Sequence, residues 1–227
     1  MQFDRTKLLI GEEKLNILQN SSVAVFGIGG VGSYVCESLV RSGIGTITII
    51  DFDKVDITNL NRQIIALNST IGKSKVSVMK NRLLDINPNL IINTYECFVS
   101  KETINDFDFS KYDYVVDAID NVTGKLLIIE NCLKNNTKII SSLGTANKLD
   151  PTKLVLTDIS KTHTCPLAKV MRLELRKREI NHLDVLFSTE LPTKNDSNIL
   201  GSMSYLPSIG GLLISSKVIL NLINEKK

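Results

Sequence analysis

A glycine-rich segment near the N-terminus constrains the fold of this chain more than any other stretch. Residues 23–26 are apolar, and the segment continues Gly27-Ile28-Gly29-Gly30-Val31-Gly32 before apolar residues recur at helical spacing. This order predicts a strand, a tight turn and a helix. Gly27 permits the sharp turn, Gly29 and Gly30 let main-chain N–H groups approach a phosphate, and Gly32 allows close helix packing. The segment therefore predicts a nucleotide-binding unit.

The chain continues as alternating strands and helices. A second strand, residues 46–50, ends in Asp51, a carboxylate placed to bind ribose hydroxyls. Helical segments are expected at 5–20, 31–39, 72–86, 123–135 and from 166, and further strands at 90–95, 112–120, 138–144, 154–159 and 185–190. We predict one α/β domain over residues 1–227, with a Rossmann-like, doubly wound, mostly parallel sheet and an antiparallel C-terminal extension. Its nucleotide-binding half spans about 1–145.

Composition and the lack of certain motifs argue against a secreted protein, a zinc-binding protein and a membrane-spanning protein. The 227 residues are 43% hydrophobic with a net charge of +3, so a large core is possible and nucleic acid is neither demanded nor excluded. No apolar signal segment begins the chain, which favours a cytoplasmic location. Four scattered cysteines form no Cys-x-x-Cys pair, so no zinc is expected. The apolar stretch 209–223 is interrupted by polar residues, which favours a buried or dimer-facing helix over a stable membrane span.

Polar residues follow the predicted strand ends, where ligands bind in such sheets. Asp53 begins the segment after Asp51, and Asn59 and Arg62 lie further along it. Taken alone, Asn59 and Arg62 are more typical of a surface loop. Lys75 opens a helix, where the dipole opposes a cation unless a phosphate is also present. Asp120, at the end of its predicted strand, is favoured over Asp117 as a Mg²⁺ ligand.

Arg5 and a basic helix can each be interpreted either as functional or as ordinary solvated surface. Arg5 lies in the N-terminal segment, and the sequence alone indicates a solvated residue. A basic helix after Pro166 carries Lys169, Arg172, Arg176, Lys177 and Arg178. This helix is either a solvated face with local ion pairs or an RNA-contacting surface, and the sequence alone favours the former.

Together these features resemble the adenylating enzymes of the ubiquitin-activating, thiamine- and molybdopterin-biosynthesis superfamily. The matching stretches are 27–32, Asp51, 58–63, Gly72-x-x-Lys75 and 117–121. The resemblance implies that Asp51 binds ribose, that Asn59, Arg62 and Lys75 bind the phosphates of ATP, and that Asp120 binds Mg²⁺. It also implies a homodimer in which Arg5 reaches the partner subunit's ATP site. These implied roles make Arg5, Arg62, Lys75 and Asp120 the candidate catalytic residues.

The second half is similar to one subfamily, the tRNA threonylcarbamoyladenosine dehydratases. Segments 41–45, 61–67, 150–154, 158–162, 165–168, 175–178 and 187–190 carry this similarity. The resemblance implies ATP-dependent cyclisation of threonylcarbamoyladenosine beside the tRNA anticodon, through an acyl-adenylate on the threonyl carboxylate. Residues 146–227 then form the substrate, tRNA and dimer half, with the basic helix as candidate tRNA contact. A sulfur-transfer or desulfurase-type protein is a further implied partner.

Two other functions remain open from the sequence. One is an adenylyltransferase that activates the C-terminus of a ubiquitin-like sulfur carrier, although the zinc-binding cysteine pairs usual in such enzymes are absent. The other is an NAD-binding dehydrogenase or regulator, which has no use for Arg62, Lys75 and Asp120. Gly201-Ser202-Met203-Ser204-Tyr205 lacks the cysteine that some dehydratases carry there, and Cys165 is interpreted as structural.

Overall fold

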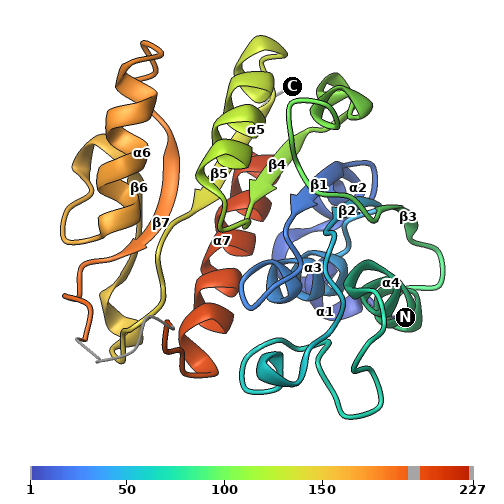
Figure 1. Ribbon diagram of the computed structural model, residues 1–227. Coiled ribbons are helices and arrows are strands. Elements are labelled where there is room, and N and C mark those ends of the chain that lie inside the picture. Colours follow the sequence, from blue (N-terminus) through green and yellow to red (C-terminus); the bar gives the residue numbers. More distant parts are fainter. Residues whose placement is uncertain (1, 194–199, 225–227) are drawn as a thin grey trace.

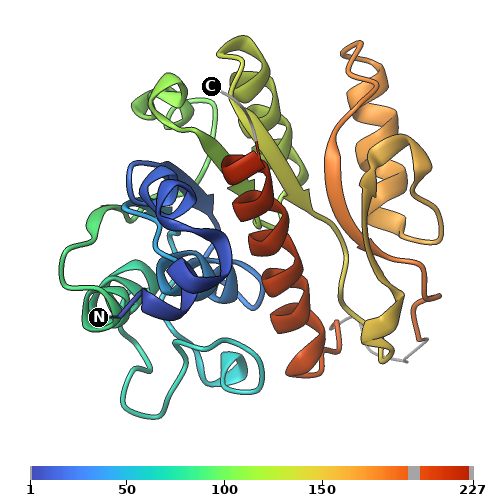
Figure 2. The same ribbon diagram turned by 180° about the vertical axis from the view of Figure 1, so that it is seen from behind.

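The computed structural model describes residues 2–193 and 200–224, which form one seven-stranded sheet with helices on both faces (Figures 1 and 2). The strands are β1 Ser22–Phe26, β2 Thr46–Ile50, β3 Ile91–Tyr95, β4 Tyr114–Asp117, β5 Lys138–Ser142, β6 Leu154–Asp158 and β7 Asp184–Ser188. The helices are α1 Asp4–Ile10, α2 Glu12–Gln19, α3 Gly32–Arg41, α4 Lys75–Ile86, α5 Val122–Lys134, α6 Pro166–Arg176 and α7 Tyr205–Asn224.

The sheet order is β3-β2-β1-β4-β5-β7-β6, and only the β6–β7 pair is antiparallel. The order reverses between β1 and β4, so the carboxyl ends of these strands flank a crevice. This topology confirms the predicted doubly wound sheet with an antiparallel C-terminal extension.

Alternate residues of β1 enter two separate hydrophobic cores. Val23 and Val25 pack with α3, α4 and α7, whereas Ala24 and Phe26 pack with α5 and α6. A strand buried on both faces must be apolar throughout, which explains why residues 23–26 are an unbroken apolar run. The fold thereby holds the glycine-rich turn at the end of a strand that is buried from Val23 to Phe26.

The apolar C-terminal stretch forms α7, which lies against α3 and the strands β5, β6 and β7 (Figure 2). By length and composition alone this helix could cross a membrane, since its most apolar 18-residue stretch has a mean hydropathy of 1.6. Half of that stretch, however, is buried inside the protein. Ile214 and Val218 are fully buried in the core shared with α3. The expected packing of a buried helix is therefore observed.

The N-terminal helical segment and the strand before Asp120 differ from the sequence prediction. The N-terminal helical segment is broken at Gly11, whose φ of 84° ends α1 and precedes α2. The strand expected over 112–120 covers only Tyr114–Asp117, because the Asp117 side chain turns back to accept a hydrogen bond from the Ile119 N–H (3.3 Å). Asp120 therefore lies in a loop.

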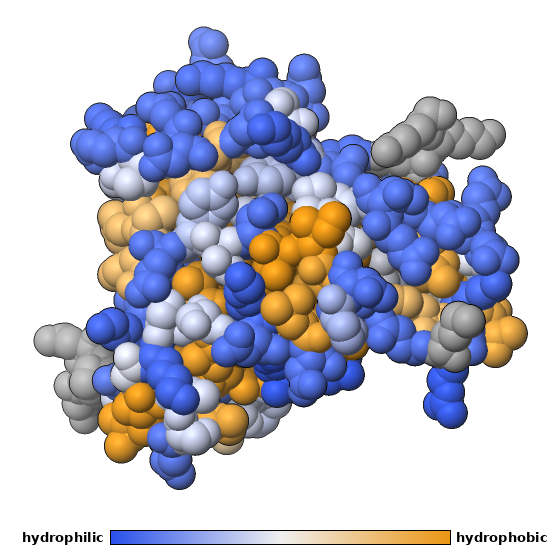
Figure 3. Space-filling view, turned by 90° about the vertical axis from the view of Figure 1, so that its right-hand side faces the viewer, coloured by the Kyte–Doolittle hydropathy of each residue, from blue (hydrophilic) through white to orange (hydrophobic). Residues whose placement is uncertain are grey.

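β3 forms one edge of the sheet. Figure 3 views the molecule from this side, where exposed hydrophobic residues form an area bordered by hydrophilic ones. Ile91 and Tyr95 of β3 are 62% and 37% exposed. The strand is short, which limits pairing of this open edge with other chains.

Candidate functional site

A cavity of about 660 Å³ opens at the carboxyl ends of β1, β2, β4 and β5. This is the place where doubly wound sheets bind ligands. The candidates that line it are Gly27, Gly29, Gly30, Asp51, Asp53, Asn59, Arg62, Lys75 and Asp120. The candidates outside its lining are Arg5, Gly32 and the basic-helix residues Lys169, Arg172, Arg176, Lys177 and Arg178. The structure thus brings together residues that are up to 93 positions apart in the chain, from Gly27 to Asp120.

The glycine-rich turn has the geometry that its sequence predicts. Gly27 has a φ of 89°, in the left-handed region that other residues rarely adopt, and a Cβ here would lie 2.7 Å from the Ala118 carbonyl oxygen. A Cβ on Gly32 would lie 1.8 Å from the Gly27 carbonyl oxygen. Gly32 therefore serves the close approach of α3 to the turn, while Gly29 and Gly30 face the cavity.

Asp51 is fixed by two main-chain donors at the end of β2. Its carboxylate accepts hydrogen bonds from the N–H of Ile28 (2.6 Å) and of Asp53 (2.8 Å). Burial raises the pKa of Asp51 above its usual value, against the opposing effects of Lys75 and of the two N–H donors. The carboxylate remains in the cavity lining, where ribose hydroxyls can reach it.

The segment after β2 holds Asn59, Arg62 and Gln63 at the cavity. Asn59 is mostly buried and its side chain accepts from the Asp56 N–H (3.1 Å), which completes a capping box around a short 3-10 helix. Among the described residues, Arg62 donates to two neutral oxygens, those of Thr58 and Asn61 (2.9 Å each), so its charge is available to an anion.

Gln63 is a site residue to which the sequence analysis assigned no role. It lines the cavity and is 7% exposed. Its Oε1 is the one buried side-chain polar atom without a hydrogen-bond partner in the described part of the chain. A buried acceptor without a donor is costly, so this atom is a further point at which a ligand can bind.

Lys75 begins α4 and extends toward the cavity. Its Nζ lies 2.6 Å from the Asp53 carboxylate, with the lysine side chain 6% exposed and the aspartate side chain 44% exposed. Asp53 thus neutralises Lys75 while remaining hydrated. A cation at a helix start beside an open cavity can exchange part of this contact for a phosphate.

Asp120 is exposed on the loop that follows β4 and faces the cavity. No cluster of three or more His, Cys, Asp or Glu residues suited to a metal occurs in the described chain. Mg²⁺ typically takes one or two carboxylates and completes its octahedron with phosphates and water. The single carboxylate of Asp120 beside a phosphate-binding turn fits that donor set.

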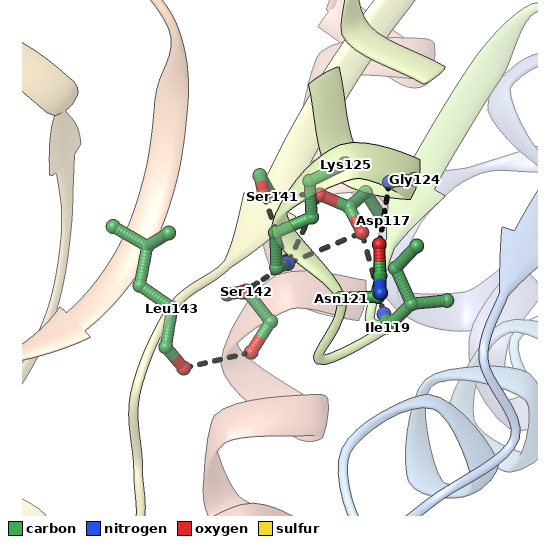
Figure 4. A network of polar contacts seen from close by, with 8 residues as sticks. All are labelled: Asp117, Ile119, Asn121, Gly124, Lys125, Ser141, Ser142 and Leu143. Carbon is green, nitrogen blue, oxygen red and sulfur yellow. Dashed lines mark hydrogen bonds and ion pairs between the residues drawn. The ribbon is translucent and has the colours of Figure 1, made fainter. Parts of the chain in front are cut away.

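Asp117, the alternative metal ligand of the sequence analysis, is fully occupied within the protein (Figure 4). Lys125 Nζ lies 3.0 Å from Asp117 Oδ2 and donates to the Ser142 carbonyl oxygen at 2.7 Å, and Ser141 Oγ donates to the same carboxylate. Both charged side chains are 0% exposed. The network joins β4, α5 and β5, and so fixes the loop that carries Asp120.

One wall of the cavity comes from segments that follow β5 in the chain. It includes Leu143, Gly144, Thr145, Ala146, Asn147, Lys148, Cys165, Pro166, Leu167 and Pro192. Cys165 caps α6, since its Sγ accepts from the Ala168 N–H (3.5 Å). Its thiol therefore has a structural contact as well as a position at the cavity wall.

The cations outside the cavity differ in how they are engaged. Arg172 donates to the Thr162 carbonyl (2.8 Å) and hydroxyl, Lys177 pairs with Glu174 (2.6 Å), and Arg178 pairs with Glu130 (2.7 Å). Lys169 and Arg176 are exposed on α6. Part of the basic helix therefore forms the local ion pairs of a solvated face.

A glycine-rich turn after β1, the Asp51 carboxylate after β2 and the cations Arg62 and Lys75 line one cavity, an arrangement typical of nucleotide-binding proteins of the doubly wound class. The sequence model of the ThiF family matches residues 3–223. The chain belongs to the ThiF family.

One relative and two solved structures indicate which members of the ThiF family this chain is similar to. The chain is 43% identical over 242 residues to the tRNA threonylcarbamoyladenosine dehydratase of Bacillus subtilis, covering 99% of this chain and 95% of that protein. The crystal structure of the Escherichia coli tRNA N6-threonylcarbamoyladenosine dehydratase with AMP superimposes with a TM-score of 0.93 at 34% identity, covering 98% of this chain and 94% of that one. The same enzyme with ATP gives a TM-score of 0.92 at 33% identity, covering 98% and 93%.

Proposed function

We propose that this protein is an ATP-dependent tRNA threonylcarbamoyladenosine dehydratase. The observation that carries the proposal is the similarity to such enzymes along nearly the whole chain, including the half that forms the cavity wall beyond β5. The substrate is tRNA bearing threonylcarbamoyladenosine next to the anticodon. The product is the cyclic form of that nucleoside.

The reaction has two steps. An oxygen of the threonyl carboxylate attacks the α-phosphorus of ATP, forming a new P–O bond while the bond to pyrophosphate breaks. The carbamoyl nitrogen then attacks the acyl carbon, forming a five-membered ring as AMP and the nitrogen's proton leave. The second step is intramolecular, so proximity supplies much of its rate without an enzymic nucleophile.

The cavity residues serve the first step. Arg62 and Lys75 supply positive charge to the phosphates, where the transferring group must be neutralised. Asp51 holds the ribose, and the turn of Gly27, Gly29 and Gly30 admits the phosphates to main-chain N–H groups. Asp120 would hold Mg²⁺, which would supply further positive charge to the phosphates.

A homodimer completes this site in our proposal. Arg5 is exposed on α1 and does not line the cavity of its own chain. Leu8 and Leu9 on the same short helix are each 86% exposed, as expected of residues that another chain covers. A two-fold interface over α1 would bring Arg5 to the partner subunit's phosphates.

Asp120 provides the test of adenylation in this cavity. Asp120→Ala should remove Mg²⁺-dependent ATP–pyrophosphate exchange supported by the modified tRNA, because its carboxylate is the protein's ligand for the metal. The exposed position predicts a melting temperature close to that of the wild type. Normal exchange by this variant would exclude Asp120 from the site. Exchange that does not depend on modified tRNA would instead favour a carrier-protein substrate.

A further inference from the structure

The part of the cavity beyond β5 contains a buried cation without a carboxylate partner. Lys148 lines the cavity and is 3% exposed. Its Nζ donates to two main-chain carbonyl oxygens, those of Ser188 (3.0 Å) and Glu190 (2.7 Å). Within residues 2–193 and 200–224 it forms no ion pair. One of its three donors remains for a ligand.

The neighbouring carboxylate is committed elsewhere. Glu190 accepts hydrogen bonds from the N–H groups of Leu149 (3.0 Å) and Asp150 (2.9 Å). It therefore fixes the loop after β5. The charge of Glu190 and the neighbouring Cys165 partly oppose the effect of burial on the pKa of Lys148, but neither forms an ion pair with its ammonium within the described residues. Buried charges in proteins are normally paired directly, so a lysine in a cavity wall that has only carbonyl partners favours an anionic ligand.

The surroundings of Lys148 strengthen this preference. Leu143, Ala146, Pro166 and Leu167 are apolar residues that line the same cavity, and ion contacts are stronger in apolar surroundings than in water. Pro166 and Leu167 also begin the 11-residue helix α6, whose N-terminal end carries partial positive charge. Burial lowers the pKa of Lys148 from 10.5, and a bound anion would oppose that shift.

We infer that Lys148 binds the carboxylate of the substrate and holds it for attack on ATP. This assignment rests on the proposed function and names the residue that recognises the reacting group. A carboxylate is favoured over the phosphates of ATP because Lys148 comes from the loop after β5. The phosphate-binding turn follows β1, and Arg62 and Lys75 come from the segments after β2.

The test compares Lys148→Met with Lys148→Arg and with Lys153→Met, an exposed lysine five residues further on. First, kinetics are measured with modified tRNA. Loss of one charge-assisted hydrogen bond should raise KM for tRNA in Lys148→Met about 10- to 100-fold. ATP affinity should stay within about twofold of wild type in all variants, and Lys148→Arg should retain part of the tRNA affinity.

A second measurement isolates the carboxylate. Binding of the free threonylcarbamoyladenosine nucleoside and of its methyl ester is compared by calorimetry, with a non-hydrolysable ATP analogue present. The wild type and Lys153→Met should prefer the acid, and folded Lys148→Met should lose that preference, whereas Lys148→Arg, which keeps a donor to the Ser188 and Glu190 carbonyls, should retain part of it. An unchanged preference, or a loss of ATP affinity instead, overturns the assignment of Lys148 alone. A wild type that does not dehydrate the tRNA overturns the proposed function and this assignment together.

Discussion

Two lysine–aspartate pairs lie at the carboxyl ends of β2 and β4, the two strands that flank β1 in the sheet. One joins Asp53, after β2, to Lys75 at the start of α4, and the other joins Asp117, at the end of β4, to Lys125 near the start of α5. Both lysines belong to helices that cross over to the next strand. Each pair therefore links the carboxyl end of a strand to the first turn of the helix that follows in the chain.

Their surroundings are different. The Asp117–Lys125 pair is 0% exposed on both sides, and Ser141 and the Ser142 carbonyl satisfy further hydrogen bonds. In the other pair the Asp53 side chain is 44% exposed, and both residues line the cavity. The comparison teaches that a closed pair is a structural joint, whereas an open pair leaves a cation available to a ligand.

The largest expected effect comes from breaking the closed pair. Lys125→Met leaves a buried carboxylate without its partner and should lower the free energy of unfolding by about 3–5 kcal/mol. Denaturant unfolding measures this, with Lys134→Met on the exposed end of α5 as a control that should change little. The double variant Asp117→Leu/Lys125→Met should be more stable than Lys125→Met, because no buried charge remains. A stable single variant would contradict the structural role of the pair.

Breaking the open pair should affect activity instead. Lys75→Met removes a phosphate-directed charge and should lower the rate of ATP-dependent turnover about 10²- to 10³-fold. The hydrated Asp53 needs little compensation, so the free energy of unfolding should change by no more than about 1 kcal/mol. Lys73→Met, on an exposed neighbour, is the matched control for charge. A Lys75→Met variant that is destabilised but fully active would show that the Asp53–Lys75 pair is structural, and would contradict its assignment to ligand binding.

The same distinction between free and paired cations applies to α6. Arg176 is exposed, whereas Lys177 is paired with Glu174 at 2.6 Å. If this helix contacts tRNA, Arg176→Ala should weaken binding several-fold. It should also reduce the slope of log affinity against log salt concentration by about one, the change expected for the loss of one phosphate contact. Lys177→Ala should have the smaller effect. Filter binding across a salt series measures both, and unchanged binding in both variants would make the helix a plain solvated face.

The smallest expected effect is a pH dependence of Asp51. Burial raises the pKa of Asp51 in the folded protein, so the folded state holds that proton more tightly than the unfolded state does. The contribution of this group to stability is therefore greatest at low pH and is lost as pH rises through the folded pKa. Ribose binding needs the ionised form of Asp51, so ATP affinity should fall as the pH is lowered. Because the pKa of Asp51 is raised, this fall should begin at a higher pH than the titration of an unperturbed aspartate would cause. Calorimetry over the acidic range in which the protein stays folded tests this, and Asp51→Asn should abolish the dependence.

Much of the fold was predictable because local patterns and topology agree. The unbroken apolar run before Gly27 requires a strand that is covered on both faces, and Gly27 and Gly32 have the close contacts that such a turn demands. The clustering of Asp51, Arg62, Lys75 and Asp120 follows from the shared edge at which parallel strands end. These predictions needed only residue type and order along the chain.

Other features depend on tertiary contacts that no local pattern encodes. Lys125 falls at helical spacing with Ile128, Ile129 and Cys132, all fully buried, and that placement was a readable signal of a buried partner. The partner itself, and the early end of β4, could not be read from the sequence. Lys148 and Gln63 gave no local signal, because their burial in the cavity wall arises only when distant segments meet.

Nucleoside mass spectrometry tests the central claim most directly. The protein is incubated with ATP, Mg²⁺ and tRNA carrying threonylcarbamoyladenosine, and the tRNA is then digested to nucleosides. We predict that the modified nucleoside loses one water, with release of AMP and pyrophosphate, only when ATP is present. An unchanged nucleoside mass from a folded protein that binds ATP would contradict the proposal and direct attention to a carrier-protein substrate.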